Sequence, residues 1–507
     1  MDPTVTAKTL EMIKTLQKSP INDPSLAGLL AKADTFVQSG SATSGLTFYD
    51  LEAGAKFLYP VLTPLRNMIP RVSGKGGIQA NWRAVTAVNT SGLRLGVSGG
   101  NRGGVMAIST KDYIAAYKGL GLEDSVTFEA QYAGMNFEDI RAIAAKTLLE
   151  ATMLGEEAVL LGGNTSFALN GGAATTTPNL ADHTAGGALV FNTAYYVVCV
   201  ALSFDAVTNG SVSATGVQGA ITRTNADGSS DTFGGGAGKV SAEATITTAN
   251  DASSAHSITA SLTAAIPGAA GYAWYLGTAS TVEKIVAITA NPTVLLTALP
   301  AAGNQLSSTL GANDNSTNNL VFDGLLTQAF AAGSGSYIGN VAGTLTADNA
   351  GGINEIETAL KSMWDNYRLG PDTMWVNSQQ ALDISKKILA GGSSGAQRFV
   401  FNSVQDALNA GVMVRSYLNR YSMAGGTSID IKIHPNMPAG MILMTSKSLP
   451  YPISNVGNLF QVRTRQDYYQ IEWPLRARRY EYGVYADEVL QHYFPPSMAV
   501  LYNITAG

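Results

Sequence analysis

One long helical pattern, between Met135 and Asn164, constrains the fold of this 507-residue chain more than any other stretch. Its apolar residues recur in steps of three or four, which keeps one face of a helix buried. The apolar positions are Phe137, Ile140, Ala144, Leu148, Ala151, Leu154, Ala158 and Leu161. The pattern predicts a helix over 136–161, with Asn136 as N-cap and Gly162 and Gly163 as its stop. Such a helix would be about 40 Å long, carries no residue set typical of catalysis, and is expected to be a rigid structural element.

The C-terminal end and the middle of this helix both require partners elsewhere in the fold. Glu156 and Glu157 lie near its C-terminus, where the helix dipole disfavours negative side chains. We therefore expect other groups to satisfy both carboxylates. Leu148 lies in the middle of the apolar stripe and is expected to be buried against a sheet that includes Ile471 and Trp473.

Length and composition limit the class of protein. A chain of 507 residues exceeds one compact core, so two to four domains are expected. Hydrophobic residues make up 45% of the chain but charged residues only 14%, against about 25% in an average soluble domain. A surface so poor in charge is consistent with coverage by neighbouring subunits. The net charge of −5 argues against a dedicated nucleic-acid-binding protein, which would carry a basic domain.

The cysteine content and the N-terminal residues bear on the compartment. Cys199 is the single cysteine and lies in the apolar run "YYVVCVAL", which excludes a disulfide framework and predicts a buried, inert thiol. The first residues, "MDPTVTAKTLEMIK", have no apolar signal core, and no run of about 18 apolar residues occurs in the sequence. We expect a protein made and used on the cytoplasmic side, without a membrane span.

The first part of the chain is divided by proline and glycine. Residues 1–45 are expected to form a polar, mostly helical arm, and the prolines in 57–77 favour an extended segment that lies along another element. The stretch "IQANWRAVTAV" predicts a strand. Residues 89–134 are rich in glycine but end in β-type patterns, "KDYIAAYKGL" and "SVTFEAQY", so a long projecting hairpin is expected.

Between 189 and 303 the composition changes to mostly Ala, Thr, Ser, Gly and Val. Short runs of β-forming residues alternate there with turn residues, and no helical pattern interrupts them, which predicts a β-sandwich. The segment "PGAAGYAWYLGT", Pro267–Thr278, resembles the central strand of fibronectin-type and immunoglobulin-like modules.

The last third returns to a mixed pattern. Helices are predicted at "GGINEIETALKSMWDNYRL" and "NSQQALDISKKIL", on either side of the buried-strand candidate "DTMWVN". The stretch "YYQIEWPLRARRYEYGVYA" alternates in polarity and predicts one strand with a bulge near Arg478. Pro474 within it favours an edge position.

Motifs that would indicate catalysis, phosphate binding or metal binding fail on their context. Ser98 and Ser393 lie in G-x-S-x-G matches, but one is in a glycine-rich loop and the other in a linker after a helix. The stretch "GGGAGKV" has Val240 where a phosphate-binding loop needs Ser or Thr. The four histidines show neither helical pairing nor partner cysteines. We predict no catalytic residue, no metal and no cofactor.

Basic residues gather in two places that could meet other molecules. Arg476, Arg478 and Arg479 could contact nucleic acid, but acidic residues alternate with them, so salt bridges between subunits are favoured. On the glycine-rich hairpin, a neighbour's carboxylates or solvent are the two alternatives for the basic residues. These are Arg94, Arg102, Lys111 and Lys118.

The order of these parts, with "EEAVLLGGN" ending the long helix and "DEVLQHYFPPSMAVLYNI" ending the chain, resembles the major capsid proteins of tailed bacteriophages. The resemblance implies an α+β fold of the Hong Kong phage type with an inserted immunoglobulin-like sandwich. It implies these parts: an N-terminal arm (1–75), an extended loop with flanking strands (76–135), a peripheral domain with the spine helix (136–188), the inserted domain (189–303), an axial domain (304–447), peripheral strands (448–486) and a C-terminal return to the axial domain (487–507).

The same resemblance implies a function. A capsid subunit would self-assemble into pentamers and hexamers of an icosahedral shell around double-stranded DNA, in a virion built in the host cytoplasm. Portal, scaffolding or decoration proteins would be its partners, DNA would be contacted without sequence specificity, and no membrane would take part. The alternatives are an encapsulin-like compartment shell, which would enclose enzyme, and a surface adhesion protein, which the missing signal peptide disfavours. A hydrolase is disfavoured because no catalytic constellation is found.

Overall fold

The computed structural model describes residues 59–88, 96–105, 108–135, 138–252, 255–390, 413–422, 426–451 and 454–507. The predicted helical arm and the Asn136 cap lie outside these ranges. The chain divides into two units, Met1–Tyr59 with Tyr132–Asp139, and Pro60–Gln131 with Ile140–Gly507. The second unit is a mixed α+β structure, and the description below concerns it.

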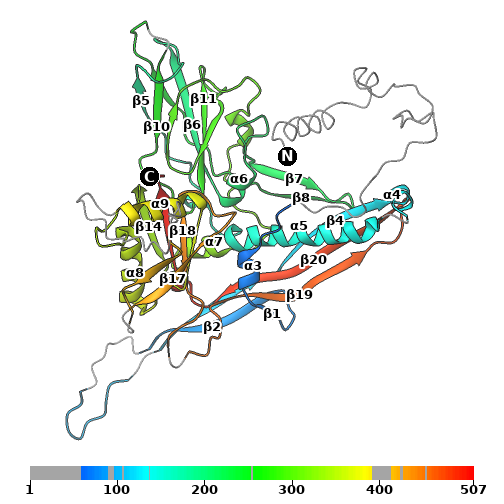
Figure 1. The fold of residues 1–507 in the computed structure, drawn as a ribbon, viewed down its shortest axis with the longest axis vertical. Helices are drawn as coiled ribbons and strands as arrows, with labels where there is room; N and C mark the ends of the chain where they lie inside the picture. The colour runs from blue at the N-terminus through cyan, green and yellow to red at the C-terminus, as the bar shows by residue number, and fades with distance from the viewer. Residues whose placement is uncertain are drawn as a thin grey trace, which may run out of the picture. The chain divides into compact units, whose positions relative to one another are not determined.

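A four-stranded sheet supports the long helix. Its strands run in the order β1 (Arg71–Ser73), β19 (Phe460–Glu472), β20 (Arg479–His492) and β4 (Lys118–Thr127). β1 is parallel to β19, and the other neighbours are antiparallel. The helix α5 (Ile140–Gly162) lies along β4 and β20 (Figure 1). This confirms the predicted long helix over the residues that the structure describes.

Leu148 is 7% exposed, as expected for the apolar stripe. It packs with Val126 of β4 and with Tyr482 and Val484 of β20, in the sheet that also contains Ile471 of β19, as predicted. Trp473 was wrongly placed in this sheet, because β19 ends at Glu472 and Trp473 is 36% exposed.

The buried face of α5 also differs from the apolar pattern. Ala151 is exposed, and the buried residues are Leu148, Thr152, Glu156, Glu157, Leu160, Leu161 and Gly162. α5 ends at Gly162, within one residue of the predicted end. Glycine is required at positions 162 and 163 because a side chain there would clash. A Cβ on Gly162 would meet the ring of Phe204 at 2.3 Å, and one on Gly163 would meet the carbonyl oxygen of Phe322 at 2.4 Å.

The predicted hairpin is present. β2 (Gln79–Val88) and β3 (Ile108–Ala116) pair antiparallel and form a sheet of their own. Only the first half of the pattern "SVTFEAQY" is a strand, and its second half forms most of the helix α4 (Phe128–Ala133). Before β2, the proline-rich segment forms α3 (Pro64–Met68) and then β1, so it lies along another element as predicted.

The single bulged strand predicted across Pro474 was wrong. The chain turns there, and β19 and β20 form an antiparallel hairpin with residues 473–478 as its connection. Pro474 has no backbone N–H to donate to a neighbouring strand. The residues "PLRARR" are exposed, so this basic stretch is in contact with solvent at the turn.

The alanine- and threonine-rich region forms two sheets. One has the order β13-β10-β5 and the other β12-β11-β6-β9. Their bounds are β5 (Asn179–His183), β6 (Ala194–Leu202), β9 (Ala244–Thr247), β10 (Ser257–Ser261), β11 (Gly271–Gly277), β12 (Lys284–Thr289) and β13 (Thr293–Leu296). One core joins both sheets and includes Cys199, Trp274, Ile258 and Leu296. The predicted sandwich of two sheets is thus present, and its first strand precedes residue 189.

The four-stranded sheet of this region is covered on its second face as well. Val198, Val200 and Tyr275 pack there with Ala206 and Leu310. The cover includes α6 (Phe204–Asn209), a helix that the composition did not predict. A small separate hairpin, β7 (Ala220–Thr224) with β8 (Ser230–Gly234), follows α6 in the connection between β6 and β9.

The remaining strands form a six-stranded mixed sheet in the order β14-β21-β18-β15-β17-β16. The strands are β14 (Tyr337–Gly343), β15 (Thr373–Val376), β16 (Ser416–Asn419), β17 (Thr427–Ile433), β18 (Ile442–Thr445) and β21 (Met498–Ile504). The helices are α7 (Leu325–Phe330), α8 (Asn354–Tyr367) and α9 (Ser378–Ala390). The two predicted helices and the buried strand β15 are confirmed.

Candidate functional site

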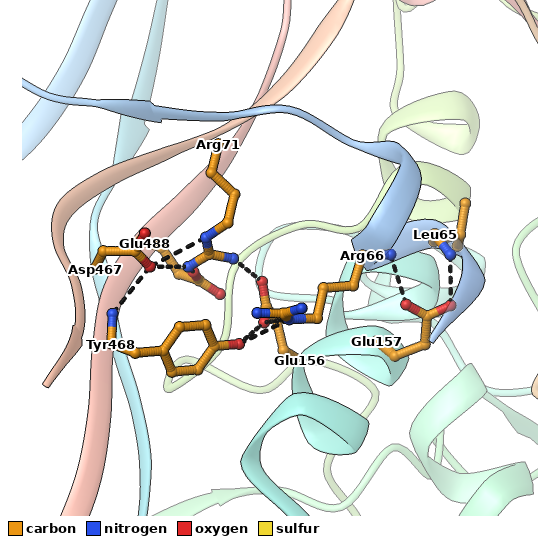
Figure 2. A network of polar contacts seen from close by, with 8 residues as sticks. All are labelled: Leu65, Arg66, Arg71, Glu156, Glu157, Asp467, Tyr468 and Glu488. Atoms are coloured by element: carbon orange, nitrogen blue, oxygen red, sulfur yellow. Dashed lines mark hydrogen bonds and ion pairs between the residues drawn. The ribbon is translucent and has the colours of Figure 1, made fainter. Parts of the chain in front are cut away.

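The described residues hold one extensive buried polar network, which we call the Glu156–Glu157 network. Figure 2 shows its members: Leu65, Arg66, Arg71, Glu156, Glu157, Asp467, Tyr468 and Glu488. They come from α3, β1, α5, β19 and β20, segments separated by up to 417 residues in the sequence. The network fastens the first described segment of the chain to the long helix and to its sheet.

Glu157 binds the first turn of α3. Its Oε1 accepts the backbone N–H of Leu65 at 2.8 Å, and its Oε2 accepts that of Arg66 at 2.7 Å. Pro64 opens α3, and Thr63 makes no side-chain cap, so Glu157 supplies the negative group that the helix N-terminus favours.

His434 completes the surroundings of Glu157. Its Nε2 lies 2.6 Å from Glu157 Oε1, and both side chains are fully buried. Its Nδ1 accepts the backbone N–H of Asn436 at 3.1 Å, so the ring proton is on Nε2, which donates to the carboxylate. The compensation expected for Glu157 is therefore present.

Glu156 faces two arginines. It accepts a hydrogen bond from Arg66 Nε at 2.9 Å and others from Arg71 Nη1 and the Tyr468 hydroxyl. Arg71 Nη2 also donates to Asp467 at 2.7 Å and to Glu488 at 2.6 Å. The planar guanidinium of Arg71 thus joins three carboxylates, one each from α5, β19 and β20.

Burial shifts the titration of this cluster. Glu488 is 0% exposed, and its Oε1 has no hydrogen-bond partner among the described residues. Desolvation and the nearby charge of Glu156 raise the pKa of Glu488 to about 8, although Arg71 opposes the shift. Desolvation and Glu156 also raise the pKa of Tyr468.

The raised pKa of Glu488 predicts a pH dependence of stability. Between its ordinary value of 4.5 and about 8, the folded protein holds a proton that the unfolded chain has released. This contribution is present below pH 4.5 and is lost as the pH rises towards 8. Relative to Glu488→Gln, the wild type should lose on the order of 3 kcal/mol of unfolding free energy between pH 5 and pH 8. Urea unfolding of both proteins across this range measures the difference, in which other titrating groups such as His492 cancel; a constant difference would refute the prediction.

The sequence indicated part of this network. The two acidic residues at the end of an apolar helix showed that partners were needed. The partners themselves were missed: Arg66, Arg71, Asp467, Tyr468, Glu488 and His434. The available signal was the pair of arginines in the otherwise uncharged stretch "PLRNMIPRV". Nothing in the sequence could indicate Glu488, because it lies in a strand paired through a distant turn.

Two of the four basic residues predicted as contacts on the hairpin, Lys111 and Lys118, have partners within the chain. Arg94 lies outside the described residues, and Arg102 is exposed. Lys111 lies 5.0 Å from the ring centroid of Tyr113, and Lys118 donates to the carbonyl oxygen of Asn319 at 2.6 Å. The structure brings both lysines to one cavity of about 540 Å³ at the base of the β2–β3 hairpin.

The three arginines near the β19–β20 turn are exposed. Two of them have acidic partners within the chain: Arg478 lies 2.8 Å from Glu129 and Arg479 lies 2.6 Å from Glu481. Arg476 lies in the turn itself. Their contacts with another subunit stay a prediction.

The described part of the chain was expected to hold no metal ion and to have an inert cysteine. No group of three or more His, Cys, Asp or Glu residues there is arranged to hold a metal ion. Cys199 is fully buried, and desolvation raises the pKa of its thiol. No helix among the described residues is long and apolar enough to cross a membrane.

No protein-family model and no curated protein matches this sequence. Solved structures are similar over most of the chain. The capsid of a native GTA particle is 10% identical, with 96% of this chain and 100% of that chain covered and a TM-score of 0.41. A Gordonia phage Cozz structure is 7% identical, covering 96% and 99%, with a TM-score of 0.41. The SrpI encapsulin of Synechococcus elongatus is 10% identical, covering 96% and 97%, with a TM-score of 0.34. Similarities as distant as these do not assign an activity to this chain.

Proposed function

We propose that this chain is a structural subunit of a closed protein shell, a major capsid protein that assembles into hexamers and pentamers around double-stranded DNA. It would act in the virion without an active site or cofactor. Portal, scaffolding or decoration proteins would join the shell. The observation that carries the proposal is the β2–β3 hairpin, whose strands join no larger sheet in the described part of the chain.

This hairpin is long and isolated. Its strands have ten and nine residues and, in the described part of the chain, pair only with each other. A two-stranded ribbon is marginally stable alone in water. Its base is anchored to the body, where Ala80 is buried in the main core and the Trp82 ring contacts that of Tyr493 with centroids 6.1 Å apart.

The ribbon exposes one apolar side chain at its base and another further along. Val85 is 61% exposed and Ile114 is 66% exposed, and the strand register places both on one face. Between them lies an ion pair, Arg83 with Asp112, whose atoms are 2.6 Å apart. A stripe of two apolar positions around a charge pair fits a complementary surface on a second copy of the chain.

The parts of the chain follow from the same proposal. α5 would be the spine helix, the β2–β3 hairpin the extended loop, and the six-stranded sheet the axial domain. The sandwich between the spine helix and that sheet would be an immunoglobulin-like domain on the outer surface. Lys111, Lys118 and the arginines of the β19–β20 turn would contact neighbouring subunits.

Assembly provides the test. Val85→Asp and Ile114→Asp are each expected to leave a folded, soluble subunit but to abolish closed shells seen by negative-stain electron microscopy, because a desolvated carboxylate would enter the contact. Val212→Asp is the matched control, since Val212 is 46% exposed in the sandwich region. It should assemble normally.

Three outcomes would change the proposal. Normal shells from Val85→Asp and Ile114→Asp would show that the ribbon is not a subunit contact. Wild-type shells that contain no nuclease-protected DNA when made in infected cells would favour the encapsulin-like alternative. A wild-type protein that stays monomeric under all assembly conditions would refute a shell function.

A further inference from the structure

A buried histidine in the sandwich has an unusual pair of partners. His256 immediately precedes β10 and is 0% exposed. Its Nδ1 lies 2.9 Å from Oδ1 of Asp182, on β5, and its Nε2 lies 2.9 Å from Oδ1 of Asp251. Both ring nitrogens therefore face carboxylate oxygens.

This geometry determines the protonation of the ring. A neutral imidazole has one N–H donor and one lone-pair acceptor, whereas an ionised carboxylate only accepts hydrogen bonds. One of the two contacts would then place a lone pair against a carboxylate oxygen. Both contacts are favourable only when His256 is an imidazolium that donates from each nitrogen.

The same residues hold two connections of the sandwich together. Asp182 Oδ2 accepts the backbone N–H of Ala249 at 2.8 Å. His256 and Leu189 exchange backbone hydrogen bonds, at 3.1 Å and 3.0 Å. Asp182 thus receives one donor from Ala249 and one from the His256 ring, and the ring carries the contact on to Asp251.

We propose that Asp182, His256 and Asp251 form a pH-sensitive clamp, closed by the buried imidazolium and opened when it loses its proton to solvent. In the open form one carboxylate contact becomes repulsive, so Asp251 separates from the ring and the hydrogen bond of Ala249 to Asp182 is weakened. The clamp belongs to the single chain and does not depend on shell assembly.

The charged surroundings favour the closed form at neutral pH. From β5 comes Asp182, and from the connection before β10 comes Asp251. His183 follows Asp182 on β5, and its Nε2 contacts the Thr259 hydroxyl at 2.9 Å, on the opposite side of the strand. Among the described residues, no lysine or arginine forms an ion pair with Asp182 or His256. The hydrogen bonds to both aspartates accordingly raise the pKa of His256.

The sign of the effect follows from this direction. The contribution of the clamp is fully present at and below the ordinary histidine value of 6.5. It is lost as the pH rises through the raised pKa in the folded state. Because opening releases one proton, the opening constant should increase by up to tenfold for each pH unit between 6.5 and the raised pKa, and should level off above it.

Hydrogen exchange of the full chain tests the proposal. Protection of the Ala249 amide, corrected for the intrinsic exchange rate, is expected to fall by up to tenfold per pH unit as the pH rises from 6.5 to the raised pKa of His256. His256→Gln should show low protection with no such pH dependence. His183→Gln, which removes the neighbouring histidine, should keep the wild-type profile.

A second measurement does not depend on how well His256→Gln folds. Nuclear magnetic resonance of ring-labelled histidine in the wild type, with His183→Gln for assignment, reports the charge of His256 directly. The ring should be an imidazolium at pH 7. A neutral ring at pH 7, or Ala249 protection that does not change with pH in the wild type, would overturn the clamp.

Discussion

Leu148→Asp is expected to prevent stable folding of the isolated subunit. Leu148 packs with Val126, Tyr482 and Val484 between α5 and its sheet. Truncation of a buried leucine to alanine costs about 2–5 kcal/mol. An aspartate at the same place adds the cost of burying a carboxylate without a partner, several kcal/mol more. Urea unfolding of the unassembled protein measures the loss, with Leu148→Ala giving the smaller, graded effect.

Ala151→Asp is the matched control for this variant. Ala151 lies one turn further along α5 but is exposed, so the new carboxylate stays in water. The expected loss is within about 1 kcal/mol, mostly from helix propensity. If Leu148→Asp were tolerated as well as Ala151→Asp, α5 would not be packed on the sheet, and the spine-helix assignment would fail.

Arg71→Met is expected to destabilise the subunit by about 3–5 kcal/mol, because it leaves buried carboxylates without their cation. The carboxylate of Glu156 and the carboxyl group of Glu488 are 2% and 0% exposed where they contact Arg71. Glu156→Gln removes one of them. The double variant Arg71→Met/Glu156→Gln should therefore be less destabilised than the sum of the two single variants, by about 1–3 kcal/mol.

An exposed arginine provides the comparison for Arg71. Arg83 pairs with Asp112, and their side chains are 69% and 63% exposed. Arg83→Met should leave the unfolding free energy of the protein nearly unchanged, because both partners of this pair are in water. Equal losses for Arg71→Met and Arg83→Met would show that the Glu156–Glu157 network does not fasten α3 and β1 to the helix.

Local pattern was sufficient to predict much of the fold. The long helix, the β2–β3 hairpin, the helices α8 and α9 and the strand β15 all follow from periodicity and turn residues. The buried face of α5 did not, because an apolar pattern leaves out polar residues that distant partners satisfy. Thr152, Glu156 and Glu157 are buried, while the apolar Ala151 is exposed.

Failures of prediction had the same origin in distant contacts. The run around Pro474 alternates as a strand would, but residues 473–478 turn back to connect β19 with β20. The network around Arg71 joins residues 85 to 417 positions apart, which no local pattern reveals. The second layer over β6 and β11 likewise depends on Leu310, beyond the end of the sandwich strands.

The position of β21 sets the order in which the chain can be completed on the ribosome. β21 lies between β14 and β18, so both of these strands have an unpaired side until residues 498–504 emerge. β1, among the first described residues, likewise waits for β19, about 390 positions later. A nascent chain would thus leave β14 without a partner and β18 open on one side until residues 498–504 have been made. A truncation that removes β21 should therefore be more harmful than its length suggests.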